Sequence, residues 1–146
     1  MKTYSQKPAE VTRKWYVIDA STAPLGRVST TAASLLLGKG KTTVTSHVDG
    51  GDYVVIINAD NLVATGKKDS DKIYYRHSKY PGGLYSRTLT EQKQLDSTKV
   101  LYKAIRGMLP VNKLRDSRLE RLKIYTGAEH NHNAQQPQVI SVKGTK

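Results

Sequence analysis

The chain has no cysteine and no phenylalanine among its 146 residues, and it has half as many acidic as basic residues. Without cysteine there is no disulfide framework, no thiolate zinc site and no thiol nucleophile, which is consistent with a reducing compartment. Long apolar runs are also lacking, because the longest, Val54 to Ile57, is far short of the roughly 20 residues of a membrane span. The start Met1 to Tyr4 leads into no apolar signal region. We therefore expect a soluble protein that is not exported.

The length of 146 residues suits one globular domain, since domains commonly contain about 100–150 residues. No internal repeat or break in composition marks a second unit, so we expect a single domain over 1–146. Within it, 1–12 form an N-terminal extension. Residues 128–146 are polar and lack apolar periodicity, which predicts an extended tail that becomes ordered on a partner.

Positive charge is in large excess, with 24 Lys and Arg against 12 Asp and Glu and a net charge of +12. Such a balance predicts a polyanionic partner, with nucleic acid as the leading candidate. The excess is concentrated between Lys99 and Lys123, where eight basic residues stand against two acidic ones. A basic membrane anchor should carry aromatic residues opposite its charges, and this segment has none between Lys103 and Ile124. A membrane partner is therefore not expected.

A strand, a helix and a second strand are predicted in the first 60 residues. The β-favouring runs are 15–20 and 52–59, and the second is apolar on both faces, which is typical of a parallel sheet covered on both sides. Between them, Leu25 to Leu36 repeats apolar residues every three or four positions, and Gly38 is a plausible helix stop. This pattern predicts a βαβ unit with a right-handed crossover.

The second half is less regular. We expect a third strand over 72–77 and a loop over 80–84. A helix should start at Asp96 or Ser97 and end before Pro110, followed by a short helix from Asn112 and a last strand over 123–125. In the short helix the leucines should be buried and the arginines should point mostly outward. The arginines that we expect to point outward are Arg115, Arg118 and Arg121.

No catalytic or nucleotide-binding motif is complete. Gly40-Lys41-Thr42 resembles the end of a phosphate-binding P-loop, but Leu35 stands where the first glycine is needed and the segment follows a helix. We interpret it as a basic turn whose Lys39, Lys41 and backbone amides contact a phosphate. Neither a cofactor nor a small-molecule substrate is expected.

Histidines and acidic residues are the remaining candidates for metal ligands or catalytic groups. His130 and His132 are two imidazoles, fewer than the three or four ligands of a zinc site, so hydrogen bonding to or stacking on RNA is the preferred interpretation. Asp49 and Asp52 lie at a loop-to-strand junction, where capping a turn is favoured over holding a metal. The sequence therefore predicts neither a metal site nor an enzyme.

Tyrosine supplies nine of the ten aromatic residues, and Tyr74, Tyr75 and Tyr80 lie among basic residues. Such interleaving allows rings to stack on unpaired bases while cations hold phosphates. Tyrosines that alternate along a strand also commonly pack inward, so both interpretations stay open. The basic neighbours are Lys72, Arg76, His77 and Lys79.

Short motifs, taken in their order and spacing, resemble the bacterial large-subunit ribosomal protein thirteen family over about 13–138. The resemblance implies a three-layer α/β/α fold on a mainly parallel four-stranded sheet, with basic loops and an extended C-terminal tail. It also implies a non-enzymatic structural role, binding of 23S-type ribosomal RNA and participation in early subunit assembly. The motifs are Trp15–Ala20, Leu25–Arg27, His47–Asp49, Gly51–Ala59, Thr65–Lys68, Lys72–Ser78, Tyr80–Leu84, Gly107–Pro110, Leu122–Gly127, Glu129–His132 and Gln135–Pro137.

The partners that the resemblance implies are large-subunit ribosomal RNA and neighbouring large-subunit proteins, in the ribosome of a bacterial cytoplasm. A translational regulator that binds its own messenger RNA is an alternative that would use the same basic surface, and a nucleic-acid-processing enzyme is another. The candidate RNA-binding residues are Arg27, Lys39, Lys41, His47, Lys67, Lys68, Lys72, Arg76, His77, Lys79, Tyr80, Arg106, Lys113, Arg115, Arg118, Arg121, Lys123, His130, His132 and Gln136.

Overall fold

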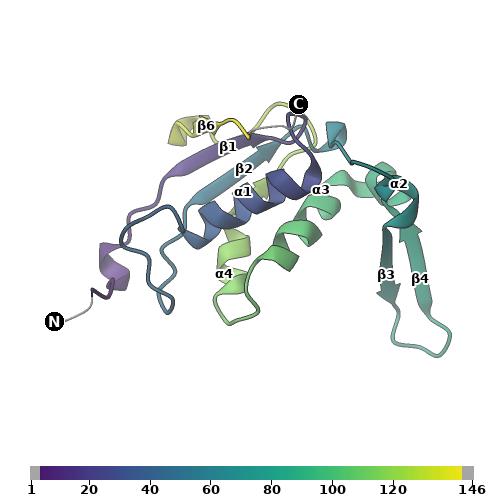
Figure 1. The fold of residues 1–146 in the computed structure, drawn as a ribbon, viewed down its shortest axis with the longest axis horizontal. Helices are drawn as coiled ribbons and strands as arrows, with labels where there is room; N and C mark the ends of the chain where they lie inside the picture. Colours follow the sequence, from purple (N-terminus) through teal and green to yellow (C-terminus); the bar gives the residue numbers. More distant parts are fainter. Residues whose placement is uncertain (1–3, 143–146) are drawn as a thin grey trace.

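The computed structural model describes residues 4–142 and has a four-stranded sheet at its centre (Figure 1). Its strands are β1 (Trp15–Asp19), β2 (Tyr53–Ile57), β5 (Leu122–Ile124) and β6 (Gln138–Ile140). They lie in the order β5-β2-β1-β6, and every neighbouring pair is parallel. The expected α/β fold with a parallel four-stranded sheet is confirmed.

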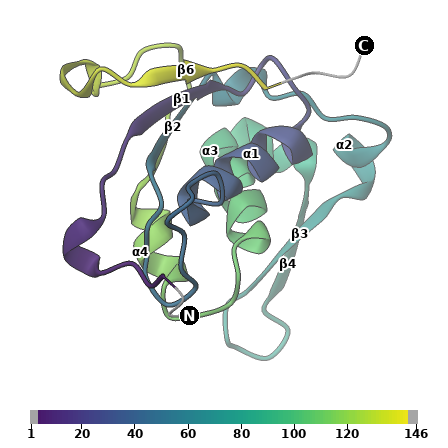
Figure 2. The same cartoon turned by 60° about the vertical axis from the view of Figure 1, so that its left-hand side comes forward.

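Two helices cover one face of this sheet, α1 (Leu25–Leu37) and α3 (Leu89–Met108), and Figure 2 shows both on the same side of β1 and β2. Alternate residues of each strand face these helices, so Ile18 is paired with Ile56 in the same layer. Burying these apolar side chains together is the main stabilisation of the fold. The fully buried residues between sheet and helices are Ile18, Val28, Leu36, Val54, Ile56, Val100, Leu101 and Ile105.

Helix α1 connects β1 to the parallel strand β2, so the predicted βαβ unit is confirmed. The helix ends where predicted because Gly38 adopts φ 74°, a left-handed conformation that glycine tolerates. There the Gly38 N–H donates to Leu35 O at 3.0 Å. A Cβ at this position would lie 3.0 Å from Gly50 O, so the turn also leaves room for the returning chain.

Helix α3 consists of two parts that meet at Asp96, whose φ of −164° and ψ of 98° are not helical. The Asp96 carboxylate accepts hydrogen bonds from the Thr98 N–H at 3.1 Å and the Thr98 hydroxyl at 2.6 Å, so it caps the second part. The predicted start at Asp96 or Ser97 is confirmed. The first part was not predicted. It begins with a capping box in which the Glu91 N–H donates to Thr88 Oγ1 and Glu91 accepts from the Thr88 N–H.

Strands β3 (Ile73–His77) and β4 (Leu84–Thr88) form a separate antiparallel hairpin, which extends beside α3 away from the central sheet in Figure 1. The third strand is thus confirmed, while the loop predicted over 80–84 overlaps the start of β4. The turn between the strands uses positive φ at Lys79 (72°) and Gly82 (72°). The Ser78 N–H donates to Gly83 O at 2.8 Å, which closes the hairpin.

The short elements complete the chain. Helix α4 (Arg115–Glu120) and β5 lie close to the predicted short helix from Asn112 and last strand over 123–125. The remaining short helices are α2 (Lys68–Asp71), η1 (Pro8–Glu10), η2 (Ala59–Asn61) and η3 (Asn133–Gln135).

The polar C-terminal tail adds a strand to the central sheet. Strand β6 pairs with the edge of β1, with Gln138 opposite Tyr16 and Ile140 opposite Ile18. The expectation that 128–146 needs a partner to become ordered is wrong for β6, because backbone pairing with β1 supplies the order. Residues 143–146 lie outside the described residues, as do residues 1–3 of the predicted N-terminal extension.

On the second face of the sheet, the C-terminal segment packs against Trp15. Trp15 stacks on Tyr53 with ring centroids 4.2 Å apart, and His132 lies 4.9 Å from Trp15, just before η3. Among the residues that the structure describes, the segment that packs on Trp15 is therefore the short helix η3 and the residues next to it.

Candidate nucleic-acid interface

Two of the predicted RNA-binding residues, Arg118 and Arg121, are buried, with exposures of 3% and 6%. Two terminal nitrogens of Arg121 bind the two carboxylate oxygens of Asp49, one of them at 2.6 Å, and Arg118 Nε lies 3.5 Å from the same carboxylate. Arg121 also donates to Leu36 O at 3.3 Å. The expectation that these two arginines point outward is wrong, because the loop before β2 brings the half-buried carboxylate of Asp49 to α4. We therefore remove both from the candidate set.

The Asp49 carboxylate is held in its charged form by these contacts. Burial alone would raise its pKa, but the hydrogen bonds and charge of Arg121 and the charge of Arg13 outweigh burial, so the pKa of Asp49 is lowered. Gly51 permits this arrangement, since a Cβ there would lie 1.8 Å from Leu36 O and 3.0 Å from an Arg121 nitrogen. The loop, α1 and α4 are thus joined at one point.

Lys41 is also occupied within the protein. Its ammonium donates to Thr12 O and Gly50 O, both at 2.8 Å, and lies 2.6 Å from an Asp52 oxygen. These three acceptors match the three donors of an ammonium group. The described contacts therefore leave the Lys41 ammonium without a free donor for the predicted phosphate contact. Asp49 and Asp52 were expected to cap turns, and their carboxylates instead bind Arg121 and Lys41.

The predicted residues around the hairpin are mostly exposed. Lys72 is half-buried, and its ammonium lies 5.5 Å from the centre of the Tyr74 ring. His77 accepts a hydrogen bond from the Lys79 N–H at 2.9 Å, which orients its ring in the turn. Tyr80 is 75% exposed, more than a tyrosine that packs into a core. The exposed members are Lys67, Lys68, Arg76, His77, Lys79 and Tyr80.

The other predicted residues are spread over the rest of the surface. His47 is exposed, and its Nε2 lies 3.2 Å from Ser5 Oγ in a hydrogen bond. Arg115 is half-buried at the start of α4. The exposed cations are Arg27 and Lys39 at the two ends of α1, Arg106 in the last turn of α3, Lys113 before α4, and Lys123 in β5.

The tail residues divide into two kinds. His132 packs against Trp15, and its Nε2 lies 3.1 Å from the Tyr125 hydroxyl, so its ring is held by the protein and we remove it from the candidate set. His130 is half-buried and accepts from the His132 N–H at 3.3 Å. Gln136 is exposed and adopts φ 47°, at the end of η3.

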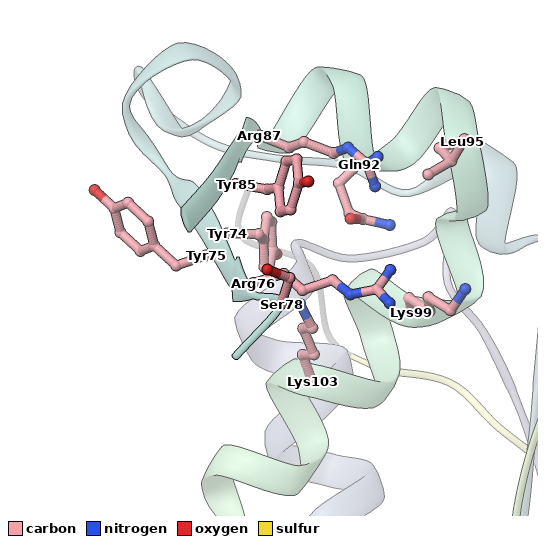
Figure 3. A pocket seen from close by; sticks show the side chains of 10 residues that line it. All are labelled: Tyr74, Tyr75, Arg76, Ser78, Tyr85, Arg87, Gln92, Leu95, Lys99 and Lys103. Atoms are coloured by element: carbon pink, nitrogen blue, oxygen red, sulfur yellow. The ribbon is translucent and has the colours of Figure 1, made fainter. Parts of the chain in front are cut away.

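A hollow of about 650 Å³ lies between the hairpin and α3, and most of its lining was not predicted. Tyr74 is directly opposite Arg87, and Arg76 is directly opposite Tyr85, so these two pairs share one face of the hairpin. No acidic side chain lines the hollow, which we call the hairpin groove. Its lining residues are Tyr74, Tyr75, Arg76, Ser78, Tyr85, Arg87, Gln92, Leu95, Lys99 and Lys103 (Figure 3).

The sequence carried a signal for the missed half of this groove. Residues 84–88 follow the turn residues Gly82-Gly83 and include Tyr85 and Thr88, residue types that favour strands, so the segment could be the second strand of a hairpin. Reading that segment as a strand places Tyr85 and Arg87 on one face, together with the residues opposite them on β3. Gln92 carries no such signal, because a buried glutamine on a helix has no distinguishing pattern.

Other chemistry finds no support in the described part of the chain. Among residues 4–142, no three His, Asp or Glu side chains gather in a way that could hold a metal ion. Nor does any helix within this range have the length and apolar character to cross a membrane.

These features define a basic α/β protein with a parallel sheet, a projecting hairpin and a cation-lined groove. The family model described as ribosomal protein L13 matches residues 13–131. A protein of Listeria welshimeri, named large ribosomal subunit protein uL13, is 54% identical over 142 residues, covering 97% of this chain and 98% of the relative. A protein of the same name from Neisseria gonorrhoeae is 52% identical over 143 residues, covering 98% and 100%.

The chain therefore belongs to the ribosomal protein L13 family. It is a ribosomal protein of the large subunit, a structural constituent and not an enzyme, as the resemblance of its motifs implied.

Proposed function

We propose that this chain binds 23S-type ribosomal RNA and supports early assembly of the large subunit in the bacterial cytoplasm. The observation that carries the proposal is the pair of arginines on the hairpin that lack acidic partners. Arg76 and Arg87 make no ion pair with any described residue, and no acid lines the groove between them and α3. Such cations are available to neutralise phosphates.

The mechanism is that of a scaffold. Cationic side chains replace the counterions of folded RNA and hold together RNA helices that would otherwise repel each other. The deep major groove of A-form RNA is closed to side chains, so contacts with phosphates, riboses and unpaired nucleotides dominate recognition. The projecting hairpin and the tail turn around Gln136 extend this surface beyond the globular core.

An early role in assembly is supported by the completeness of the core. The sheet, α1 and α3 bury their apolar residues against each other, so the fold requires no other protein before it meets RNA. Neighbouring large-subunit proteins then join a surface that this chain has already ordered.

Binding to its own messenger RNA is the alternative function, and the same cations would carry it. Sedimentation separates the two, because a structural constituent travels almost wholly with large subunits. An appreciable pool with messenger RNA, outside subunits, would favour the regulator.

Salt dependence tests the electrostatic mechanism. If about five to eight phosphates are neutralised, affinity for a 23S-type RNA fragment should fall about a hundredfold or more between low and moderate salt. The fragment should be bound in the absence of any other ribosomal protein, as an early assembly role requires. A flat salt response would contradict the mechanism, and binding that needs other proteins first would contradict the early role.

A further inference from the structure

Two polar groups at the floor of the hairpin groove have no partner. Gln92 is 5% exposed, and its amide nitrogen is buried without a hydrogen bond to any described residue. The hydroxyl of Tyr74, which lines the same groove, is also buried and has no hydrogen-bond partner among the described residues. Buried polar groups are nearly always hydrogen-bonded, so two orphans lining one hollow indicate that a ligand completes them.

The walls of the groove carry a ring and cations. Tyr85 is 60% exposed, and in Figure 3 its ring lies beside Tyr74 and Gln92, with the Arg76 and Arg87 guanidinium groups on the same side of the hairpin. Tyr75, on the opposite face of β3, points away from this group (Figure 3). The groove therefore combines an aromatic surface, hydrogen-bonding groups and positive charge.

Not every cation at the groove is available. Lys99 lies 3.0 Å from Asp96 in an ion pair, and the Lys103 ammonium lies 5.0 Å from the centre of the Tyr74 ring. The guanidinium groups of Arg76 and Arg87 make no hydrogen bond or ion pair with any described residue, and guanidinium groups match the geometry of phosphate oxygens.

We propose that the hairpin groove binds one unpaired RNA nucleotide. The base stacks on Tyr85, the edge of the base accepts hydrogen bonds from the Gln92 amide and the Tyr74 hydroxyl, and the phosphate contacts Arg76 and Arg87. This inference rests on the proposed RNA-binding function and assigns a nucleotide to one part of the surface. An inorganic anion would use only the arginines, and an acidic peptide would leave the stacking surface empty, whereas a nucleotide uses all three features.

Two hairpin RNAs test the proposal with the full-length protein. They share one stem, and one of them carries a single bulged nucleotide. The bulged RNA should bind about tenfold or more tightly, in line with the effect of one base stacked on an aromatic side chain. Tyr85→Ala and Gln92→Leu should each remove most of this preference. Tyr102→Ala and Gln94→Leu, at exposed positions of α3 outside the groove lining, should keep it.

Thermal unfolding distinguishes a binding role of Gln92 from a packing role. Leucine has a similar size and removes an unpartnered amide, so Gln92→Leu should melt at the same or a higher temperature than the wild-type protein while losing the bulge preference. A lower melting temperature with the preference retained would make Gln92 a packing residue and overturn the proposal.

The outcomes separate this inference from the proposed function. Equal binding of the two RNAs by the wild-type protein, or a preference that survives both groove variants, overturns the nucleotide site while salt-dependent RNA binding still stands. If neither RNA is bound, the proposed function fails with it. The last measurement is the affinity of the protein for free uridine monophosphate or guanosine monophosphate. If a free nucleotide binds as tightly as the bulged RNA, the groove is a site for free nucleotides and the RNA proposal is overturned.

Discussion

Arg121 binds both carboxylate oxygens of Asp49 across 72 residues of sequence. The pair is largely withdrawn from water, with side-chain exposures of 8% for the arginine and 13% for the aspartate. Arg118 lies beside the same carboxylate, so two buried cations depend on one acid. This cluster joins the loop before β2 to the C-terminal end of α4.

The first prediction is that Asp49→Asn is strongly destabilising. Removing one partner of a buried ion pair leaves the other charge uncompensated, which costs about 3–5 kcal/mol of unfolding free energy. Urea denaturation measures the effect, with Asp116→Asn on the exposed side of α4 as the control, for which a change within about 0.5 kcal/mol is expected. Equal stability of the two variants would show that the cluster contributes nothing to the fold.

The second prediction concerns pH. The pKa of Asp49 is lower in the folded protein than its ordinary value of about 3.9, so its contribution is fully present above about pH 4 and is lost as pH falls through the folded value. Urea midpoints measured from neutral to acid pH should therefore fall less steeply in Asp49→Asn than in the wild-type protein. Asp19 and Asp96, whose pKa values are also lowered, are present in both proteins, so the difference isolates Asp49. Superimposable acid profiles would contradict the assignment.

Features set by neighbours in the chain were predictable. The spacing from Leu25 to Leu36, with Gly38 after it, indicated helix α1, and the β-branched run of β2 indicated a strand buried on both faces. The Asp96 cap was also visible, because its side chain bonds to an N–H only two residues away. In each case the stabilising contact is local in sequence, or the spacing of apolar residues itself indicates which side chains are buried.

Features that depend on residues far away in the sequence could not be predicted. Arg118 and Arg121 have the same local pattern as exposed helix arginines, and only Asp49, far away in sequence, makes their burial possible. The same applies to Lys41, whose acceptors include Thr12 and Asp52. Strand β6 was missed because its order comes from pairing with β1 and not from its own composition.

The third prediction tests the close approach at Gly51. A methyl group there would lie 1.8 Å from Leu36 O, which is main chain and cannot move without shifting α1. Gly51→Ala should therefore lower the unfolding free energy by at least about 1–3 kcal/mol, as overpacked cores do. Gly40→Ala is the matched control, since a Cβ there meets nothing within 4 Å and its stability should stay within about 0.5 kcal/mol. An unchanged stability of Gly51→Ala would refute the close approach of the chain before β2 to the end of α1.

The fourth prediction separates cations that bind RNA from cations that hold the fold. Arg106 and Lys113 are exposed, so Arg106→Gln and Lys113→Gln should each change stability by less than about 0.5 kcal/mol. If each contacts a phosphate, its loss weakens RNA binding uniformly across sequences and makes the salt slope shallower by about one unit. RNA titrations at several salt concentrations measure both effects.

Arg121→Gln is the contrasting variant, because its guanidinium is bound to Asp49 and Leu36 O and is largely withdrawn from solvent. It should lose about 3–5 kcal/mol in urea denaturation, and the molecules that remain folded should bind RNA with the wild-type salt slope. A second contrast is Leu101→Ala, fully buried in the core, which should cost about 2–5 kcal/mol without altering the slope. A shallower slope in folded Arg121→Gln, with Arg106→Gln unchanged, would return Arg121 to the RNA-binding surface and place the interface on α4.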